Sequence, residues 1–220
     1  MNIGKAFTFA FEDKDWLKKI GIAGLVMLIP FIGQLTVSGW ALEVTRRVIN
    51  RDPETLPDWS AFGDYLVKGL KIFVIGLVYA LPIILLSMCV NLPLSFFQDS
   101  SNETTVSMVV AASFFINCIV ALFGFALAFV LPAALAKFAV TDELGAAFRF
   151  GEVFGLLRAA PGAYLLALLG AIVASIVASL GLILCFIGVI FTLAWAYVIQ
   201  SHLWGQAYNE AMASQSGQVG

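Results

Sequence analysis

Hydrophobic residues follow one another along most of this chain, and charged residues interrupt them at only a few places. Residues 20–42, 72–98, 104–136 and 159–209 contain no Asp, Glu, Lys or Arg. As one helix, the last run would extend about 77 Å, whereas the hydrocarbon core of a bilayer is about 30 Å thick. Backbone groups find no water inside a bilayer, so each pass must be helical and the run must reverse near an interface. We place that reversal at Gly181.

The pattern predicts an all-α, polytopic integral membrane protein with about six membrane helices arranged as three hairpins. We expect one membrane domain over residues 1–220, in which an amphipathic cytoplasmic segment precedes each hairpin. The expected parts are hairpin one at 16–51, an interfacial helix at 53–66, hairpin two at 67–139, an interfacial segment at 141–158, hairpin three at 161–208 and a flexible tail at 209–220.

The first apolar run allows two interpretations. It is long enough for one spanning helix, but Pro30 and Gly33 lie in its middle, and Pro-x-x-Gly is typical of turns. Two short helices that enter and leave from the cytoplasmic side would keep the basic residues on both flanks inside. One true span with an external amino terminus is the alternative. Elsewhere, Pro82 and Pro132 are further candidate helix breaks.

Charge and aromatic residues set the expected orientation. The chain is 61% hydrophobic and only 12% charged, which is about half the charge of an ordinary soluble domain. The hairpin arrangement puts all 12 Lys and Arg on the cytoplasmic face of the inner (plasma) membrane, together with both termini. No cleavable signal is expected, because acids interrupt the first 19 residues. The expected interfacial anchors are Trp16, Trp59, His202, Trp204 and Tyr208.

Polar residues in the second hairpin suggest contacts between its two helices. If the hairpin turns about Asn102, Ser87 lies level with Asn117, and Asn91 lies level with Ser113. Two polar pairs on one shared face would each contribute about 0.6 kcal/mol and so would set register more than stability. Alternatively, each side chain bonds a backbone carbonyl of its own helix.

Small residues recur every four positions in both helices of the third hairpin. Such stripes let helix backbones approach closely inside a membrane. If the hairpin turns at Gly181, Gly170 should face Thr192, and Ala174 should face Gly188. The two stripes are Gly170, Ala174 and Ala178, and Gly188, Thr192 and Ala196.

The sequence offers little for catalysis. His202 is the only histidine, so no site with several histidine ligands can form within one chain. Cys89, Cys118 and Cys185 are far apart in apolar runs and are expected to be buried small hydrophobes. We therefore expect no catalytic, cofactor-binding or metal-binding residues. Nucleic-acid binding is also excluded, because lipid headgroups already account for basic residues scattered along the membrane edges.

Several motifs, read together from Lys5 to Tyr208, resemble an uncharacterised prokaryotic membrane family, domain of unknown function 4013. A weaker similarity extends to six-helix membrane domains, including the membrane part of some glycerophosphodiester phosphodiesterases. The resemblance implies the hairpin architecture and brings no catalytic residues. The motifs are Phe11-Glu12-Asp13-Lys14-Asp15-Trp16-Leu17-Lys18-Lys19, Leu56-Pro57-Asp58-Trp59, Phe62-Gly63-Asp64, Phe148-Arg149-Phe150 and Ser201-His202-Leu203-Trp204-Gly205-Gln206-Ala207-Tyr208.

The expected function is association rather than catalysis. We expect an accessory subunit, scaffold or homo-oligomer whose partners are membrane lipids and either a second copy or another membrane protein. The alternative is a permease or lipid-handling protein with a cavity between hairpins. It would not be coupled to ions, because no ionisable residue lies at the expected midplane. A cavity lined by Gln34 and the polar residues of hairpin two would favour that alternative.

Overall fold

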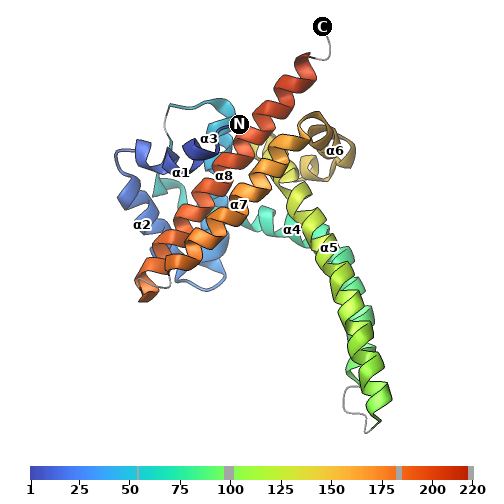
Figure 1. Ribbon diagram of the computed structural model, residues 1–220. Coiled ribbons are helices and arrows are strands. Elements are labelled where there is room, and N and C mark those ends of the chain that lie inside the picture. Colours follow the sequence, from blue (N-terminus) through green and yellow to red (C-terminus); the bar gives the residue numbers. More distant parts are fainter. Residues whose placement is uncertain (54, 97–101, 182–184, 218–220) are drawn as a thin grey trace. The chain divides into compact units, whose positions relative to one another are not determined.

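Helices make up all the regular structure in the described part of the chain. The computed structural model describes residues 1–53, 55–96, 102–181 and 185–217 (Figure 1). Over these residues, three short 3₁₀ helices, η1 (Phe9–Glu12), η2 (Trp59–Ala61) and η3 (Leu144–Phe148), accompany eight α-helices. The α-helices are α1 (Ile3–Thr8), α2 (Trp16–Met27), α3 (Ile32–Asn50), α4 (Phe62–Ser95), α5 (Glu103–Thr141), α6 (Phe150–Ala159), α7 (Pro161–Leu180) and α8 (Cys185–Gly217). The all-α class expected from the sequence is confirmed.

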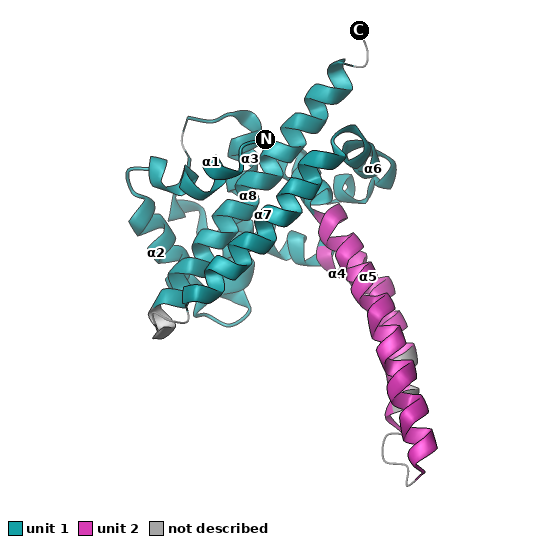
Figure 2. Cartoon of the chain, viewed as in Figure 1, with its two compact units in different colours: residues 1–75, 132–220 teal, residues 76–131 magenta. Residues whose placement is uncertain are grey.

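The chain forms two compact units, coloured separately in Figure 2. Unit 1 comprises residues 1–75 and 132–220, and unit 2 comprises residues 76–131. Among the described residues, three helical stretches are long and apolar enough to cross a membrane, namely Trp59–Cys89, Glu103–Thr141 and Pro161–Leu180. These lengths and compositions indicate a membrane protein.

The first apolar run is two helices rather than one. Helix α2 ends at Met27, and α3 begins at Ile32 after a turn through Pro30. Phe31 adopts a positive φ of 61°, which a side chain rarely tolerates outside tight turns. A Cβ at Gly33 would overlap the carbonyl of Val26, so only glycine allows α3 to start this close to α2. The expected break at Pro30 and Gly33 lies here.

The other two prolines do not break their helices, which corrects the sequence-based expectation. Helix α4 continues through Pro82, and α5 continues through Pro132. A proline removes one backbone donor, but at least nine helical residues on each side of it hold the helix together. Gly181 directly follows α7 and caps it. Residues 182–184, which complete the expected reversal, lie outside the described residues.

The first connecting segment differs from the interfacial helix that was expected. Residues 55–58 are irregular, and only the 3₁₀ turn η2 precedes α4, so no separate helix spans 53–66. The backbone of this segment bonds side chains of unit 1, as described below, instead of its own earlier carbonyls. At Thr141 helix α5 ends, and Asp142 turns the chain with a positive φ of 57°. Helices η3 and α6 then follow.

Helix α8 lies at the centre of unit 1. It runs beside α7 and contacts α1, α2, α3 and α6 (Figure 1). The core between α8 and α3 contains Trp40, Val44 and Val198, all fully buried. Helix α3 also meets the start of α4 closely, since a Cβ on Gly39 or on Gly69 would overlap the backbone of the other helix. These contacts make unit 1 a frame for the polar side chains described next.

Candidate functional site

The two motifs nearest the first hairpin meet in one polar cluster of unit 1. One Asp13 oxygen accepts hydrogen bonds from Lys19 Nζ at 2.9 Å, from the Thr55 hydroxyl at 3.2 Å and from the Leu56 amide at 3.2 Å. Its other oxygen accepts from the Asp15 amide at 2.8 Å. We call Asp13, Lys19, Thr55 and Leu56 the Asp13 cluster. It ties the start of α2 to the segment before α4.

Lys19 completes the cluster from the other side. Its ammonium also donates to the Leu56 carbonyl at 2.8 Å and lies 3.4 Å from an Asp58 carboxylate oxygen. The Asp13 and Lys19 side chains are only 9% and 12% exposed. A charge this shielded from water is stable only when it is paired and hydrogen-bonded, and both conditions hold here.

The interactions within the cluster lower the pKa of Asp13 and raise the pKa of Lys19. Burial by itself would raise the pKa of Asp13, but the hydrogen bonds from Lys19, Asp15 and Leu56 outweigh it and hold the pKa below its ordinary value. Burial would likewise lower the pKa of Lys19, but Asp13 and Asp58 raise it above its ordinary value. With four donors on its two oxygens, Asp13 is suited to positioning the chain rather than to taking up a proton.

Aromatic rings cover this cluster. The Trp59 indole donates to the Lys19 carbonyl at 2.9 Å and stacks on Trp40 with ring centroids 5.3 Å apart. The Trp40 indole in turn donates to the Pro57 carbonyl at 3.0 Å. Trp16 packs edge-on against Phe11 with ring centroids 4.8 Å apart. Trp16 and Trp59, expected as interfacial anchors, are therefore half-buried in contacts within unit 1.

The third hairpin packs through small residues, but in a different register from the one expected. The Thr192 hydroxyl donates to the Ala178 carbonyl at 2.9 Å, and a Cβ on Gly170 would meet the side chain of Leu203. Gly170 therefore does not face Thr192, and that pairing was wrong. Thr192 lies near the start of α8, which begins at Cys185, and so packs beside the last turn of α7, whereas the partner of Gly170 lies 11 residues further along α8.

The rest of the two stripes lies at the same helix pair. Ala174 is fully buried, Ala178 and Ala196 are nearly so, and Gly188 is partly exposed. A Cβ on Gly181 would overlap the Thr192 hydroxyl and approach the Gly188 carbonyl. Gly188 therefore approaches Gly181, which follows α7, and not Ala174 as expected.

The asparagines of the second hairpin bond within their own helices. Asn91 Nδ2 donates to the Ser87 carbonyl at 2.9 Å, and Asn117 Nδ2 donates to the Ser113 carbonyl at 2.7 Å. Each asparagine side chain thus donates to the backbone carbonyl four residues earlier in its own helix, as the second of the two interpretations expects. Pairing between the two helices stays a prediction.

The expected anchor His202 lies inside unit 1 and does not face outwards. It is 3% exposed, and its ring lies 4.2 Å from that of Phe9. The amino-terminal helix α1 covers this side of α8, which no local pattern around His202 indicates. Trp204 and Tyr208, by contrast, are each partly exposed.

Two cavities meet at Tyr197 of α8. One, of about 460 Å³, lies between α7 and α8 and includes Ser175, Ser179 and Gln200. The other, of about 420 Å³, lies between α3, α4 and α8 and includes Gln34 and Ser38 among mainly apolar side chains. Gln34 therefore lines a cavity, but a mainly apolar one whose lining includes none of the polar residues of hairpin two, so the cavity that was expected to combine them is not the one found here.

The described residues contain no cluster of side chains suited to binding a metal ion. No three His, Cys, Asp or Glu side chains in this part of the chain are grouped as metal ligands. Cys89 and Cys118 are free and exposed, which corrects the expectation that they are buried. They lie on apolar helices of unit 2, where hydrophobic residues also face outwards. The side chain of Cys185 lies outside the described residues.

Comparison with known proteins bears on the whole arrangement. Neither the curated proteins nor the solved structures contain a match to this chain. A family model described as a protein of unknown function (DUF4013) matches residues 22–187. That range runs from α2 to the start of α8 and covers well over half of the chain, so it includes all three apolar helices. The chain therefore belongs to the DUF4013 family.

Proposed function

We propose that this protein is a non-catalytic, multi-pass protein of the inner membrane that acts by association, as a homo-oligomer, scaffold or accessory subunit. Its three hairpins would comprise about six membrane helices, the first hairpin being short and re-entrant, with both termini in the cytoplasm. Its partners would be membrane lipids and either a second copy of this chain or another membrane protein.

The tip of the first hairpin supports the re-entrant arrangement. Side chains at the end of α2 and in the following turn are large, apolar and exposed, and Phe31 reaches 82% exposure. Such a patch is unfavourable in water and favourable in lipid. Helix α2 would extend only about 18 Å at about 1.5 Å per residue, so this tip would enter the bilayer without crossing it. The residues are Leu25, Leu28, Ile29, Phe31 and Ile32.

An exposed stripe of small residues on α7 is the observation that carries the association proposal. Ala171, Ser175 and Ser179 follow one another at intervals of four, and both serines are exposed. The Ser175 hydroxyl donates to the Ala171 carbonyl, and the Ser179 hydroxyl donates to the Ser175 carbonyl, each at 2.9 Å. The side chains of this stripe are therefore small, and the two serine hydroxyls already donate hydrogen bonds within α7. A second helix could approach it closely, as small-xxx-small surfaces allow in membranes.

The test is the mass of the intact protein purified in a mild detergent and in lipid nanodiscs. The wild type should form a dimer or larger assembly, and Ser175→Leu should shift it towards monomer because the larger side chain separates the helices. Ile176→Leu, on the neighbouring face and with little change in volume, should leave the assembly unchanged. A wild-type protein that is monomeric at all concentrations, and carries no second protein, would contradict association.

A lipid-handling role is the second candidate, and the cavity between α3, α4 and α8 favours it. Apolar side chains such as Leu35, Leu70 and Phe73 line this cavity, whereas Gln34 and Ser38 add polar groups. Such a lining suits an amphipathic molecule with an acyl chain and a polar atom. In the same mass measurement, a monomer that retains one lipid, and loses it in Gln34→Leu, would support this role over association.

A further inference from the structure

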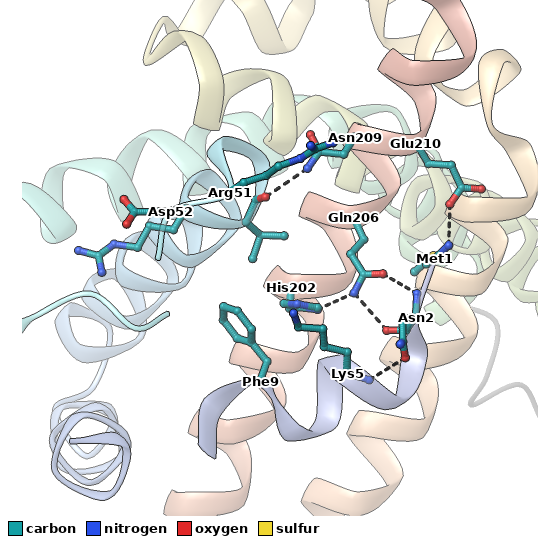
Figure 3. A pocket seen from close by; sticks show the side chains of 12 residues that line it. Met1, Asn2, Lys5, Phe9, Arg51, Asp52, His202, Gln206, Asn209 and Glu210 are labelled. Atoms are coloured by element: carbon teal, nitrogen blue, oxygen red, sulfur yellow. Dashed lines mark hydrogen bonds and ion pairs between the residues drawn. The ribbon is translucent and has the colours of Figure 1, made fainter. Parts of the chain in front are cut away.

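A polar cavity lies at the junction of α1, α3 and α8 (Figure 3). Its volume is about 490 Å³, within the range of small-molecule sites. All its walls belong to unit 1, and it is separate from the stripe on α7 and from the Tyr197 cavities. We call it the His202 cavity. Its principal polar residues are Asn2, Lys5, Arg51, His202 and Gln206.

The hydrogen bonds around Gln206 determine the state of the histidine. The Asn2 backbone amide donates to Gln206 Oε1 at 2.6 Å, and since a backbone amide can only donate, this atom of Gln206 is the oxygen. Gln206 Nε2 then donates to the Asn2 carbonyl at 3.1 Å and lies 2.8 Å from His202 Nδ1. Nδ1 must accept, so a neutral His202 carries its proton on Nε2.

That proton has no acceptor in the described part of the chain. The interactions of His202 there are the contact of Nδ1 with Gln206 and the ring contact with Phe9. The ring is 97% buried, but Nε2 is not among the fully enclosed polar atoms that have no partner, so this donor is open to the cavity. Because His202 lines the cavity, an acceptor in the cavity could supply this contact.

Cations on the cavity wall indicate that the acceptor is negatively charged. Figure 3 shows the Lys5 side chain reaching towards the His202 ring. Lys5 and Arg51 form no ion pair with a carboxylate among the described residues, whereas Glu210 is already paired with the Met1 amine at 3.0 Å. Arg47 and Asp52 also line the cavity. Unpaired basic groups beside a neutral donor suit an oxyanion with several acceptor oxygens.

We propose that the His202 cavity binds the phosphate group of an anionic ligand, through Lys5, Arg51 and the Nε2–H of His202. The same chemistry is offered by a phospholipid headgroup and by a soluble phosphate compound. The cavity holds more than a single phosphate, which leaves room for a substituent. Binding here is independent of the association through α7 proposed above, and would persist in a monomer.

The single histidine makes the site directly observable by NMR. Full-length protein with labelled histidine, and with any affinity tag removed, would be placed in nanodiscs of phosphatidylcholine alone. Titration with inorganic phosphate should shift the Nε2–H resonance of His202 if a soluble phosphate is the ligand. Replacing part of the lipid with phosphatidylglycerol should shift it without added phosphate if a lipid headgroup is the ligand.

Two variants distinguish a built site from general charge attraction. Lys5→Ala should weaken binding at least about tenfold, since it removes a charge-assisted contact. Lys14→Ala makes the same charge change at an exposed position outside the cavity and should leave binding unchanged. Equal effects of both variants, or no shift of His202 with either phosphate or phosphatidylglycerol, would overturn the proposal.

Discussion

At the scale of single residues, the described part of unit 1 depends on a few buried polar groups with several partners each. Asp13 accepts four hydrogen bonds, and Gln206 links Asn2 to His202. Each of these side chains joins segments far apart in the sequence, so the loss of one leaves several groups unsatisfied at once. An unsatisfied buried group costs more than a hydrogen bond contributes, which makes these positions sensitive.

Replacing Asp13 with Asn should destabilise the protein by about 1–3 kcal/mol, because the Lys19 ammonium would remain shielded without its counter-charge. The measurement is the thermal unfolding midpoint in a mild detergent. Asp15→Asn is the matched control, since it removes an exposed carboxylate two residues away. Equal midpoints for the two variants would show that the cluster contributes nothing to stability.

The stability supplied by Asp13 should depend on pH with a definite sign. Its folded pKa lies below its ordinary value, so the folded protein releases the proton more readily than the unfolded chain. The contribution is therefore complete above the ordinary value of about 4 and is lost as pH falls through the folded pKa. For Lys19, whose pKa is raised, the contribution is lost at alkaline pH instead.

The difference in unfolding midpoint between wild type and Asp13→Asn should accordingly stay constant from about pH 5 to 9 and shrink below about pH 4. A difference that instead grew on acidification would mean that the folded pKa is raised, contrary to the hydrogen bonds of the cluster.

At the scale of helices, close backbone contact occurs at a place that no repeated small-residue stripe marks. Gly39 of α3 and Gly69 at the start of α4 allow these helices to touch, because a Cβ on either would overlap backbone atoms of the other. Neither glycine has another small residue four positions before or after it, since Leu35 and Glu43 flank Gly39, and Tyr65 and Phe73 flank Gly69. The stripes of α7 and α8 did indicate the packing of that helix pair, but their register required the position of the turn.

Gly69→Ala should therefore destabilise unit 1 by about 1–3 kcal/mol, since the added methyl group forces α3 and α4 apart. Gly63→Ala, in the first turn of the same helix and with no atom within 4 Å of the added carbon, is the control. That control should be neutral, or stabilising by up to about 1 kcal/mol. Thermal unfolding in detergent measures both, and a neutral Gly69→Ala would show that the two helices are not held this closely.

At the scale of the whole molecule, the proposed topology makes a prediction about the sides of the membrane. Single cysteines would be introduced at Lys14, Asn102 and Gln215 after the three native cysteines are replaced by alanine. With a re-entrant first hairpin, a membrane-impermeant thiol reagent added outside should label only Cys at position 102. Positions 14 and 215 should be labelled after permeabilisation, and labelling of these two from opposite sides would mean that the first run crosses the bilayer.

The helical class and the first break could be predicted from the sequence, because both follow from local requirements. Uncharged runs inside a bilayer must satisfy their own backbone groups, which only a helix does within one segment. Pro30 and Gly33 stop a helix through their own geometry, and the structure has the break there. Pro82 and Pro132 look similar locally, but at least nine helical residues on each side of them outweigh a single missing donor.

The sequence by itself thus determined that this chain is helical, apolar enough for a membrane, and a member of its family. Only the tertiary structure decided which side chains meet. The Asp13 cluster, the register of α7 against α8 and the burial of His202 under α1 each join residues from distant segments. Such contacts depend on where whole helices lie in space, and a pattern of neighbouring residues carries no information about that.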